Sequence, residues 1–319
     1  MNFGIIGCSR VARRRFLPAF AESDCARLIS VGSRSPAKAG EYAREFGAEQ
    51  FGDYDSILAN KKVDAVYIST PPLLHTEWVL KAAKAGKHII CEKPAFPTLA
   101  EARAALAACR RANVRLFENY AFLYHPQHAA ARALLPKIGG LARIEVEYLY
   151  PFPPEGDIRL KPELGGGVFH DSFGYPIALS LWYFDGTPSS VSYKKTFDSK
   201  RGIDIAGDIA LHFSNGRELT GRVEIGSERY TSHYTLHGPK GSIEVCRAFA
   251  VDADKPAAIV ATVANCEEKI TIPPASQFQL ALEDFCAAVR DDIEKNYAKE
   301  ILARAEIKER ALLSYEKII

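Results

Sequence analysis

The chain has 319 residues, a formal net charge of +2, and a composition that is 47% hydrophobic and 25% charged. This length allows two domains with a large core. The small charge, without a basic run interleaved with aromatics, argues against a nucleic-acid partner. No apolar stretch is long enough for a membrane span and no signal peptide precedes the first strand, so we expect a cytoplasmic protein without a membrane partner. Seven scattered cysteines without C-x-x-C spacing favour reduced thiols and no metal site.

The first predicted element is a short strand at residues 2–6 that leads into a glycine turn and a helix near 10–21. The turn matches the dinucleotide fingerprint G-x-G-x-x-G/A, except that Ser9 replaces the middle glycine. A strand, a tight turn and a helix N-terminus place backbone N–H groups where a pyrophosphate can bind. The candidate cofactor-binding residues here are Gly7, Ser9, Arg10, Val11 and Ala12.

The second predicted strand, at 28–32, ends at the position where the cofactor ribose is usually recognised. An acidic residue there binds the 2′-hydroxyl of NAD, whereas an arginine accommodates the 2′-phosphate of NADP. This chain has no acid at that position and reads Ser33-Arg34-Ser35. Ser33 and Arg34 can both donate to a phosphate. We therefore expect NADP(H), with NAD(H) as the alternative, and interpret Arg14 and Arg15 as a solvated helix face.

The pattern of predicted secondary structure differs between the two parts of the chain. Up to about residue 120, strands alternate with helices, which predicts a doubly wound parallel Rossmann sheet. The remaining strands of this part are expected near 64–69, 87–91 and 114–117, and its remaining helices near 36–46, 54–60, 74–85 and 98–112. Residues 121–319 are expected to form an α+β domain with a large, mostly antiparallel open sheet. Its strands are predicted near 144–150, 190–198, 205–213, 218–226, 231–237 and 242–246, and its helices near 173–184, 277–293 and 298–315.

Polar residues follow two of the predicted parallel strands. Thr70, Pro71, Pro72 and His75 come after one strand, and Glu92-Lys93-Pro94 comes after the next. Loops at the carboxyl ends of such strands face the ligand crevice. His75 is either a cofactor contact or, equally, a helix-start residue bonded to the backbone.

A lysine and a tyrosine can together assist the reduction of a ketone by a hydride donor. Hydride transfer places negative charge on the substrate oxygen, which needs a nearby cation and a proton donor. A tyrosine with a pKa near ~10 becomes a better acid beside a lysine. Lys93 and Tyr175 would form this couple. Taken singly, each is better explained as a surface lysine or a helix-start aromatic, but their joint occurrence after the strand end favours function.

A glycine-rich segment, Gly165-Gly166-Gly167, precedes Asp171 and Tyr175. Together with the Thr70–His75 and Glu92–Pro94 loops, in this order and spacing, it resembles the glucose–fructose oxidoreductase, inositol dehydrogenase and rhizopine-catabolism family (Gfo/Idh/MocA) over essentially the whole chain. The resemblance implies that Lys93 lies beside the nicotinamide and contacts the substrate oxygen. It implies that Asp171 orients the substrate and the catalytic pair, and that the bond before Pro94 is often cis.

Tyr175 stands where inositol-type members of the family have histidine. With a tyrosine at this position, the chain resembles the keto-sugar reductase, aldose dehydrogenase and dihydrodiol dehydrogenase branch. The resemblance also implies a homodimer or homotetramer formed through the open face of the second sheet. Four apolar residues on the strands of that sheet suit burial in such an interface, but equally a core under the helices: Tyr193, Phe197, Val223 and Ile225.

Two further resemblances indicate candidate substrate-binding residues. The run from Glu118 to Gln127 resembles E-A-F-x-Y-R-F-H-P-Q of the family, with Leu123 where an arginine is usual. It offers Tyr120, His125 and Gln127 as pocket residues, although the latter two could instead cap a helix. Segments 153–164 and 202–207 resemble the subgroup that acts on nucleotide-linked deoxysugars. There Arg159 and Lys161 either meet the substrate diphosphate or are solvated loop charges.

Three functions are compatible with these residues. The first is an NADPH-dependent reductase of a sugar ketone, with a nucleotide-linked keto sugar as substrate. The second uses the same chemistry and oxidises a free aldose or a trans-dihydrodiol with NADP. The third is a dinucleotide-binding sensor without turnover, which would need neither Lys93 nor Tyr175.

Overall fold

The computed structural model describes the backbone of residues 1–316 and the side chains of residues 1–314. The chain forms two compact units, Met1–Tyr120 with Phe278–Ala305, and Ala121–Gln277 with the segment from Glu306 onward. The first division lies at the predicted position, but residues 278–305 belong to the first unit, not the second. Among the described residues, no helix is both long and apolar enough to cross a membrane.

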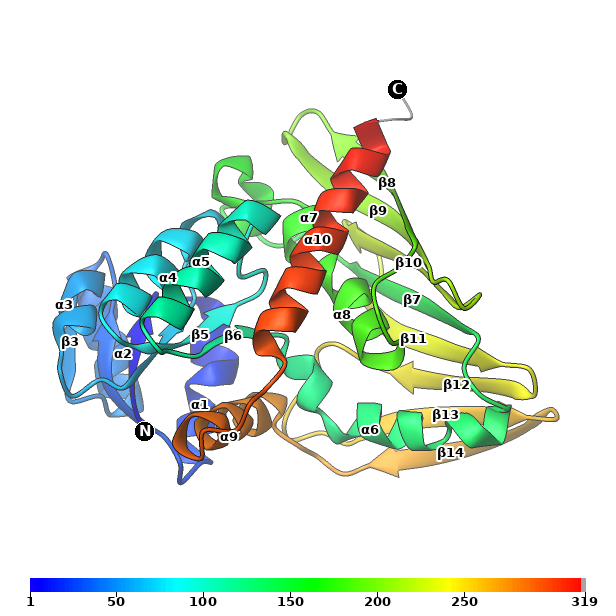
Figure 1. Cartoon of the computed structure of the whole chain (residues 1–319), viewed down its shortest axis with the longest axis horizontal. Coiled ribbons are helices and arrows are strands. Elements are labelled where there is room, and N and C mark those ends of the chain that lie inside the picture. Colours follow the sequence, from blue (N-terminus) through cyan, green and yellow to red (C-terminus); the bar gives the residue numbers. More distant parts are fainter. Residues whose placement is uncertain (317–319) are drawn as a thin grey trace. The chain divides into compact units, whose positions relative to one another are not determined.

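The first unit is built on six parallel strands in the order β3-β2-β1-β4-β5-β6, as the alternating pattern predicts (Figure 1). Phe3, Ile5 and Ile6 of β1 are fully buried, because the central strand of a doubly wound sheet is covered on both faces. The short β3 is missing from the predicted elements. The strands are β1 (Asn2–Ile6), β2 (Arg27–Gly32), β3 (Gln50–Gly52), β4 (Ala65–Ile68), β5 (His88–Glu92) and β6 (Leu116–Asn119).

Helices connect these strands, and α4 and α5 pack side by side (Figure 1). The helix predicted near 10–21 is divided into a π-helical turn and a short α-helix. Ile301 and Ala305 of the last helix lie in the same apolar core as Val79 and Leu116. This burial explains why the segment joins the first unit. The helices are the π-helical turn (Ala12–Phe16), α1 (Pro18–Ala21), α2 (Pro36–Phe46), α3 (Tyr54–Ala59), α4 (His75–Lys84), α5 (Leu99–Arg111), α9 (Gln277–Arg290) and α10 (Tyr297–Glu316). The part of α10 from Glu306 onward belongs to the second unit.

The second unit contains an eight-stranded sheet in the order β14-β13-β12-β11-β7-β10-β9-β8 (Figure 1). Only β7 and β10 pair in parallel among these described strands, so the mostly antiparallel sheet is confirmed. β13 and β14 are missing from the prediction. The strands are β7 (Arg143–Tyr150), β8 (Ser190–Asp198), β9 (Ile203–His212), β10 (Glu218–Ile225), β11 (Thr231–Gly238), β12 (Gly241–Cys246), β13 (Ala257–Val263) and β14 (Cys266–Ile272).

The helices of the second unit cover one face of this sheet. They are α6 (Pro126–Ala133), α7 (Val168–Asp171) and α8 (Gly174–Tyr183), with α7 and α8 packed on β10. Tyr193, Val223 and Ile225 are at most 1% exposed. Val168 of α7 packs with both Val223 and Ile225. Of the two interpretations left open by the sequence, the core under the helices is therefore correct for these three residues. Phe197, by contrast, is 53% exposed.

Candidate active site

Gly7 lies where the ends of β1, β2 and β4 meet. Its φ is 104°, and its N–H donates to the Gly32 carbonyl oxygen at 3.1 Å. A Cβ atom here would lie 2.9 Å from the Ser69 carbonyl carbon and 3.0 Å from the Thr70 nitrogen. Only glycine allows both the positive φ and this close approach. The fingerprint turn is thus formed as a tight backbone cradle.

The side chain of Ser9 accepts a hydrogen bond that the glycine of the fingerprint could not accept. Its hydroxyl accepts a hydrogen bond from the Ala12 N–H at 3.1 Å, and its carbonyl oxygen accepts one from the Tyr42 hydroxyl at 3.1 Å. The next turn is π-helical, with Leu17 N–H donating to Ala12 O at 2.8 Å. The Ala12 N–H is therefore already satisfied by Ser9. Arg10 is exposed beside this turn.

The end of β2 carries hydroxyl groups and an exposed cation. The Ser33 hydroxyl accepts from the Ser35 N–H at 3.2 Å, and the Ser35 hydroxyl accepts from the Lys38 N–H at 3.4 Å. Ser35 is thereby the N-cap of α2. Arg34 lies between the two serines and is exposed. An arginine at a helix N-terminus suits a phosphate group.

His75 joins the loops that follow β4 and β5. Its Nε2 lies 2.8 Å from the Thr70 carbonyl oxygen, and its Nδ1 lies 2.8 Å from the Pro94 carbonyl oxygen. The ring is 1% exposed, and burial lowers its pKa. This geometry corresponds to the backbone-bonded alternative, in which His75 holds two loops together. The Lys93–Pro94 peptide bond is cis, as the family resemblance implies.

The Glu92 carboxylate is buried and hydrogen-bonded to neighbouring side chains. Its Oε1 accepts from the Tyr67 hydroxyl and from the Asn119 amide, both at 2.7 Å. Burial raises its pKa, and the Tyr67 and Asn119 hydrogen bonds oppose that rise. The next residue, Lys93, is only partly buried. The end of β5 thus has a buried, hydrogen-bonded carboxylate followed by a partly buried lysine.

Two polar atoms at the strand ends fit a bound nucleotide. Thr70 Oγ1 and Asn119 Oδ1 are buried and have no hydrogen-bond partner among the described residues. Thr70 follows β4, and Asn119 ends β6. Buried polar atoms normally have a partner, so these two atoms are suited to the amide and hydroxyl groups of a dinucleotide. Together with the Gly7 cradle and Arg34, the first unit fits NADP(H).

A buried ion pair supports the loop after Lys93, and sequence reasoning missed it. Arg304 Nε lies 2.6 Å from Glu118 Oε2, and Glu118 Oε1 accepts from the Ala95 N–H at 2.8 Å. The Arg304 guanidinium also lies 4.9 Å from the centre of the Tyr120 ring. Tyr120 is 3% exposed, so it is placed as a packing partner rather than as an open pocket residue. Arg304 is nearly 190 positions from Glu118 in sequence, and no local signal links them.

Tyr175 lies at the start of α8 within the second unit. Three rings surround it, with centre-to-centre distances of 5.4 Å to Phe122, 5.1 Å to Tyr148 and 5.1 Å to Phe249. The side chain is partly buried. Such packing restricts the ring and leaves part of it accessible, as a proton donor requires.

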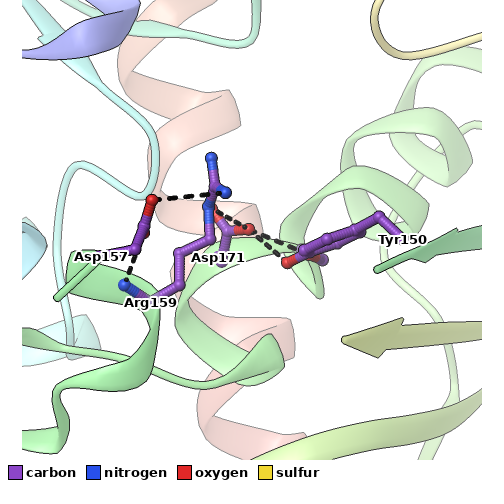
Figure 2. A network of polar contacts seen from close by, with 5 residues as sticks. Tyr150, Asp157, Arg159 and Asp171 are labelled. Carbon is purple, nitrogen blue, oxygen red and sulfur yellow. Dashed lines mark hydrogen bonds and ion pairs between the residues drawn. The ribbon is translucent and has the colours of Figure 1, made fainter. Parts of the chain in front are cut away.

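Asp171 is the last residue of α7, four positions before Tyr175 of α8, and is the centre of a polar network (Figure 2). Its Oδ2 accepts from the Tyr150 hydroxyl at 2.5 Å and lies 3.3 Å from Arg159 Nε. Tyr150 and Ser172 hydroxyls are 2.9 Å apart. Arg159 was predicted to meet a substrate diphosphate or to be a solvated charge, and the structure places it against Asp171. Tyr150 is absent from the predicted site.

The glycine-rich segment before Asp171 is required by its surroundings. A Cβ atom on Gly167 would collide with the Asp204 carboxylate, and one on Gly166 would lie 2.7 Å from the Arg159 carbonyl oxygen. Asp204 Oδ2 accepts from the Phe169 N–H at 2.8 Å. It also accepts from the Tyr193 hydroxyl at 3.0 Å. Segment 202–207, singled out in the sequence, therefore fixes the start of α7.

His125 and Gln127 lie in a buried polar cluster of the second unit. His125 caps α6, with Nδ1 accepting from the Gln127 N–H at 3.3 Å, as the alternative interpretation expects. The two residues are at most 1% exposed. His125 Nε2 and Gln127 Oε1 have no hydrogen-bond partner among the described residues. The cluster continues through His128, whose Nδ1 lies 2.9 Å from the Tyr234 hydroxyl.

We expect acid to destabilise the protein through His128. Burial lowers the pKa of His128 from 6.5 to about 3. Because the unfolded chain then binds the proton more tightly, the free energy of unfolding falls as the pH decreases from about 6.5 toward 3. Replacing His128→Asn should flatten part of this dependence in melting temperatures measured from pH 7 to pH 4.5. His212→Asn is the control, because the His212 side chain is 51% exposed. A wild-type slope in the His128 variant would contradict this account.

Known proteins resemble this chain over nearly its whole length. Residues 1–120 match a family model described as "Oxidoreductase family, NAD-binding Rossmann fold", and residues 128–244 match the "GFO/IDH/MocA C-terminal domain". A dTDP-3,4-didehydro-2,6-dideoxy-alpha-D-glucose 3-reductase from Saccharopolyspora spinosa is 32% identical, over 91% of this chain and 88% of its own. A D-xylose 1-dehydrogenase (NADP(+)) from Haloferax volcanii is 30% identical, over 91% of this chain and 89% of its own.

A solved structure shows the same fold. KijD10, a 3-ketoreductase from Actinomadura kijaniata in complex with NADP and TDP-benzene, superposes with a TM-score of 0.94 at 27% identity, over 98% of this chain and 97% of its own. Structures of KijD10 also exist in which a tyrosine is replaced by phenylalanine and a lysine by alanine. These matches confirm the resemblance that the sequence motifs suggested. The chain belongs to the GFO/IDH/MocA oxidoreductase family, on the branch of its sugar-nucleotide reductases and aldose dehydrogenases.

Proposed function

We propose that this protein is an NADP(H)-dependent oxidoreductase that reduces the ketone of a nucleotide-linked keto sugar. The observation that carries the proposal is the presence of both functional groups in one chain of this family. Lys93 follows β5 in the first unit and precedes the cis proline Pro94, and Tyr175 lies in the first turn of α8 in the second unit. The lysine and tyrosine altered in KijD10 are separated by nearly the same length of chain.

The first unit would hold the cofactor with the residues predicted from the sequence. The Gly7 cradle, with Ser9, Arg10, Val11 and Ala12 after it, would receive the pyrophosphate. Ser33 and Arg34 would bind the 2′-phosphate of NADP. The loop from Thr70 to His75, with Glu92 and Lys93, would line the nicotinamide side. NADPH bound there supplies the hydride.

The residues of this chain would handle the charge and the proton. As hydride arrives at the keto carbon, negative charge develops on its oxygen, and the Lys93 ammonium stabilises that charge. The Tyr175 hydroxyl donates the proton that converts the alkoxide into an alcohol. Asp171 would orient the sugar and Tyr175. A sensor without turnover would use neither group, and their joint retention favours an enzyme.

The second candidate function is oxidation of a free aldose with NADP. The similarity to the Haloferax volcanii xylose dehydrogenase supports it, at nearly the same identity and coverage as the reductases. The two functions share Lys93, Tyr175 and the cofactor and differ in the substrate. The departure at Leu123, where an arginine is usual, favours the reductase.

Turnover measurements separate these functions. The purified protein should oxidise NADPH with dTDP-3,4-didehydro-2,6-dideoxy-glucose and show a much lower kcat/KM with D-xylose and NADP. A higher kcat/KM for D-xylose would establish the aldose dehydrogenase instead. NADPH binding without turnover of keto sugars, aldoses or trans-dihydrodiols would indicate a dinucleotide-binding sensor.

Replacing Arg34→Ala should change the cofactor preference. Loss of a charge-assisted contact to the 2′-phosphate costs about 1.5–3 kcal/mol, so the KM for NADPH should rise about 10- to 100-fold. The KM for NADH should stay near its wild-type value, because NADH lacks this phosphate. Arg14→Ala is the control, since Arg14 is exposed on a helix face. An equal rise for both cofactors would show that Arg34 does not read the phosphate.

The proposal includes a homodimer or homotetramer formed through the open face of the second sheet. That face carries polar pairs, with His237 Nε2 and Glu145 Oε2 2.9 Å apart and Arg222 Nη1 and Asp208 Oδ1 2.9 Å apart. An interface there would be polar and sensitive to salt.

A further inference from the structure

Tyr150 and Arg159 both contact the same carboxylate oxygen, and neither contact is explained by substrate binding. Figure 2 shows the two side chains reaching Asp171 from different directions. Asp171 Oδ2 accepts from the Tyr150 hydroxyl at 2.5 Å and from the Ser172 hydroxyl at 3.3 Å, and it forms an ion pair with Arg159 Nε at 3.3 Å. Two hydroxyl donors and a nearby cation stabilise a carboxylate in its charged form.

Tyr150 is a rigid member of this network. It is the last residue of β7, is 8% exposed, and packs in an apolar cluster with Val168 and Val223. Burial and the Asp171 carboxylate raise the pKa of Tyr150 well above 10, so its hydroxyl remains a donor throughout the neutral range. Its ring also lies 5.3 Å from Tyr148, which packs against Tyr175.

Arg159 is linked to the segment around Asp171 through both its backbone and its guanidinium group. Its N–H donates to Asp157 Oδ1 at 3.1 Å, and its carbonyl oxygen accepts from the Gly167 N–H at 2.9 Å. Its guanidinium lies 3.9 Å from Asp157 Oδ2 as well as 3.3 Å from Asp171. The Asp171 charge raises the pKa of Arg159. Two carboxylates already balance this cation, which argues against a role as the receptor of a substrate diphosphate.

We propose that Tyr150 and Arg159 are positioning residues that together hold Asp171, at the end of α7, as a fixed, ionised carboxylate. They act through Asp171 and do not touch the reacting atoms. This inference rests on the proposed ketone reduction, in which Asp171 orients the sugar and the proton donor.

The pH dependence of kcat tests this role in the variants Tyr150→Phe and Arg159→Gln. Each variant removes one stabilising contact to Asp171, so protonation of that carboxylate becomes easier, and we expect the acid limb of kcat to move to higher pH by about one unit. We also expect kcat at pH 7 to fall about tenfold, because the carboxylate, although still ionised there, is no longer held in position. The KM for the dTDP-linked sugar and its competition by dTDP should stay near wild type.

Tyr297→Phe is the matched control for Tyr150→Phe. Tyr297 is also 8% exposed and also donates its hydroxyl to a carboxylate, Asp284, at 2.6 Å, but in the first unit and outside the proposed machinery. Its variant should show the wild-type pH profile with a similar loss in melting temperature. If the acid limb shifts equally in the Tyr297 variant, the effect is a general loss of stability and the inference is overturned.

Arg159 has a second possible outcome that would overturn the inference. A raised KM and weakened dTDP competition in Arg159→Gln, with an unchanged pH profile, would make it a diphosphate ligand.

If the wild type reduces no keto sugar, the proposed function fails, but the network remains testable. The titration of the Asp171 carboxyl can be followed by carbon-13 NMR, with Asp171→Asn to assign the signal. Its midpoint should rise in both variants, and an unmoved midpoint would refute the network itself.

Discussion

Replacing Tyr175→Phe should lower kcat for keto-sugar reduction by about 10²- to 10⁴-fold, because the alkoxide loses its positioned proton donor. Phenylalanine keeps the packing against Phe122, Tyr148 and Phe249, so folding should be unaffected. The affinity for NADPH, measured by fluorescence titration, should also stay near wild type. Steady-state kinetics at saturating NADPH give the comparison.

Lys93→Met should lower kcat by a comparable amount, about 10²- to 10³-fold, because the developing oxyanion loses its cation. Methionine preserves most of the length of the side chain. Two matched controls test whether the losses are specific. Tyr230→Phe removes a hydroxyl from a tyrosine that is 47% exposed, and Lys84→Met removes a charge from the end of α4. If Tyr175→Phe and Lys93→Met retain the rates of these controls, the catalytic assignment is wrong.

Replacing Arg304→Met should destabilise the first unit by about 3–5 kcal/mol, because it leaves the Glu118 carboxylate buried without its partner. Glu118 and Arg304 are 5% and 4% exposed, so water cannot replace the lost interaction. Urea denaturation measures the change in the free energy of unfolding. Since Glu118 also accepts from the Ala95 N–H, the loop after Lys93 should loosen and kcat should fall as well.

A second variant tests the cause of this loss. Glu118→Gln combined with Arg304→Met removes both charges and keeps an acceptor for the Ala95 N–H, so most of the lost stability should return. Arg290→Met is the control, because Arg290 and Asp291 form an exposed pair on α9 that should contribute at most about 1 kcal/mol. A double variant as unstable as Arg304→Met would show that the charge of Glu118 is not the problem.

The sequence predicted the parts of the fold that have local periodicity. The parallel strands, their helices and the strands from 144 to 246 were read from runs of apolar and β-branched residues. β3 was missed because it has only three residues, and β13 and β14 because alanines, threonines and charges dilute their pattern. The packing of residues 278–305 on the first unit was missed because an amphipathic helix does not reveal which surface it covers.

The candidate site was predictable where a loop motif specifies the chemistry. Gly7, Arg34, Lys93 and Tyr175 lie at strand or helix ends that the sequence already marks. Tyr150, Asp204 and Arg304 could not be found in this way, because each acts through a partner that is distant in sequence. Their contacts depend on how strands and helices pack, which a single sequence does not encode locally.

Following a deuterium label from NADPH into the sugar tests the central claim most directly. With NADPH deuterated at the transferred C4 position and dTDP-3,4-didehydro-2,6-dideoxy-glucose, mass spectrometry of the product should show one deuterium at the former keto carbon. The initial rate at which labelled product forms should fall at least about 10²-fold in both Tyr175→Phe and Lys93→Met while each variant still binds NADPH. Unlabelled sugar from the wild-type protein, or labelled product formed at the wild-type rate by either variant, would contradict the account.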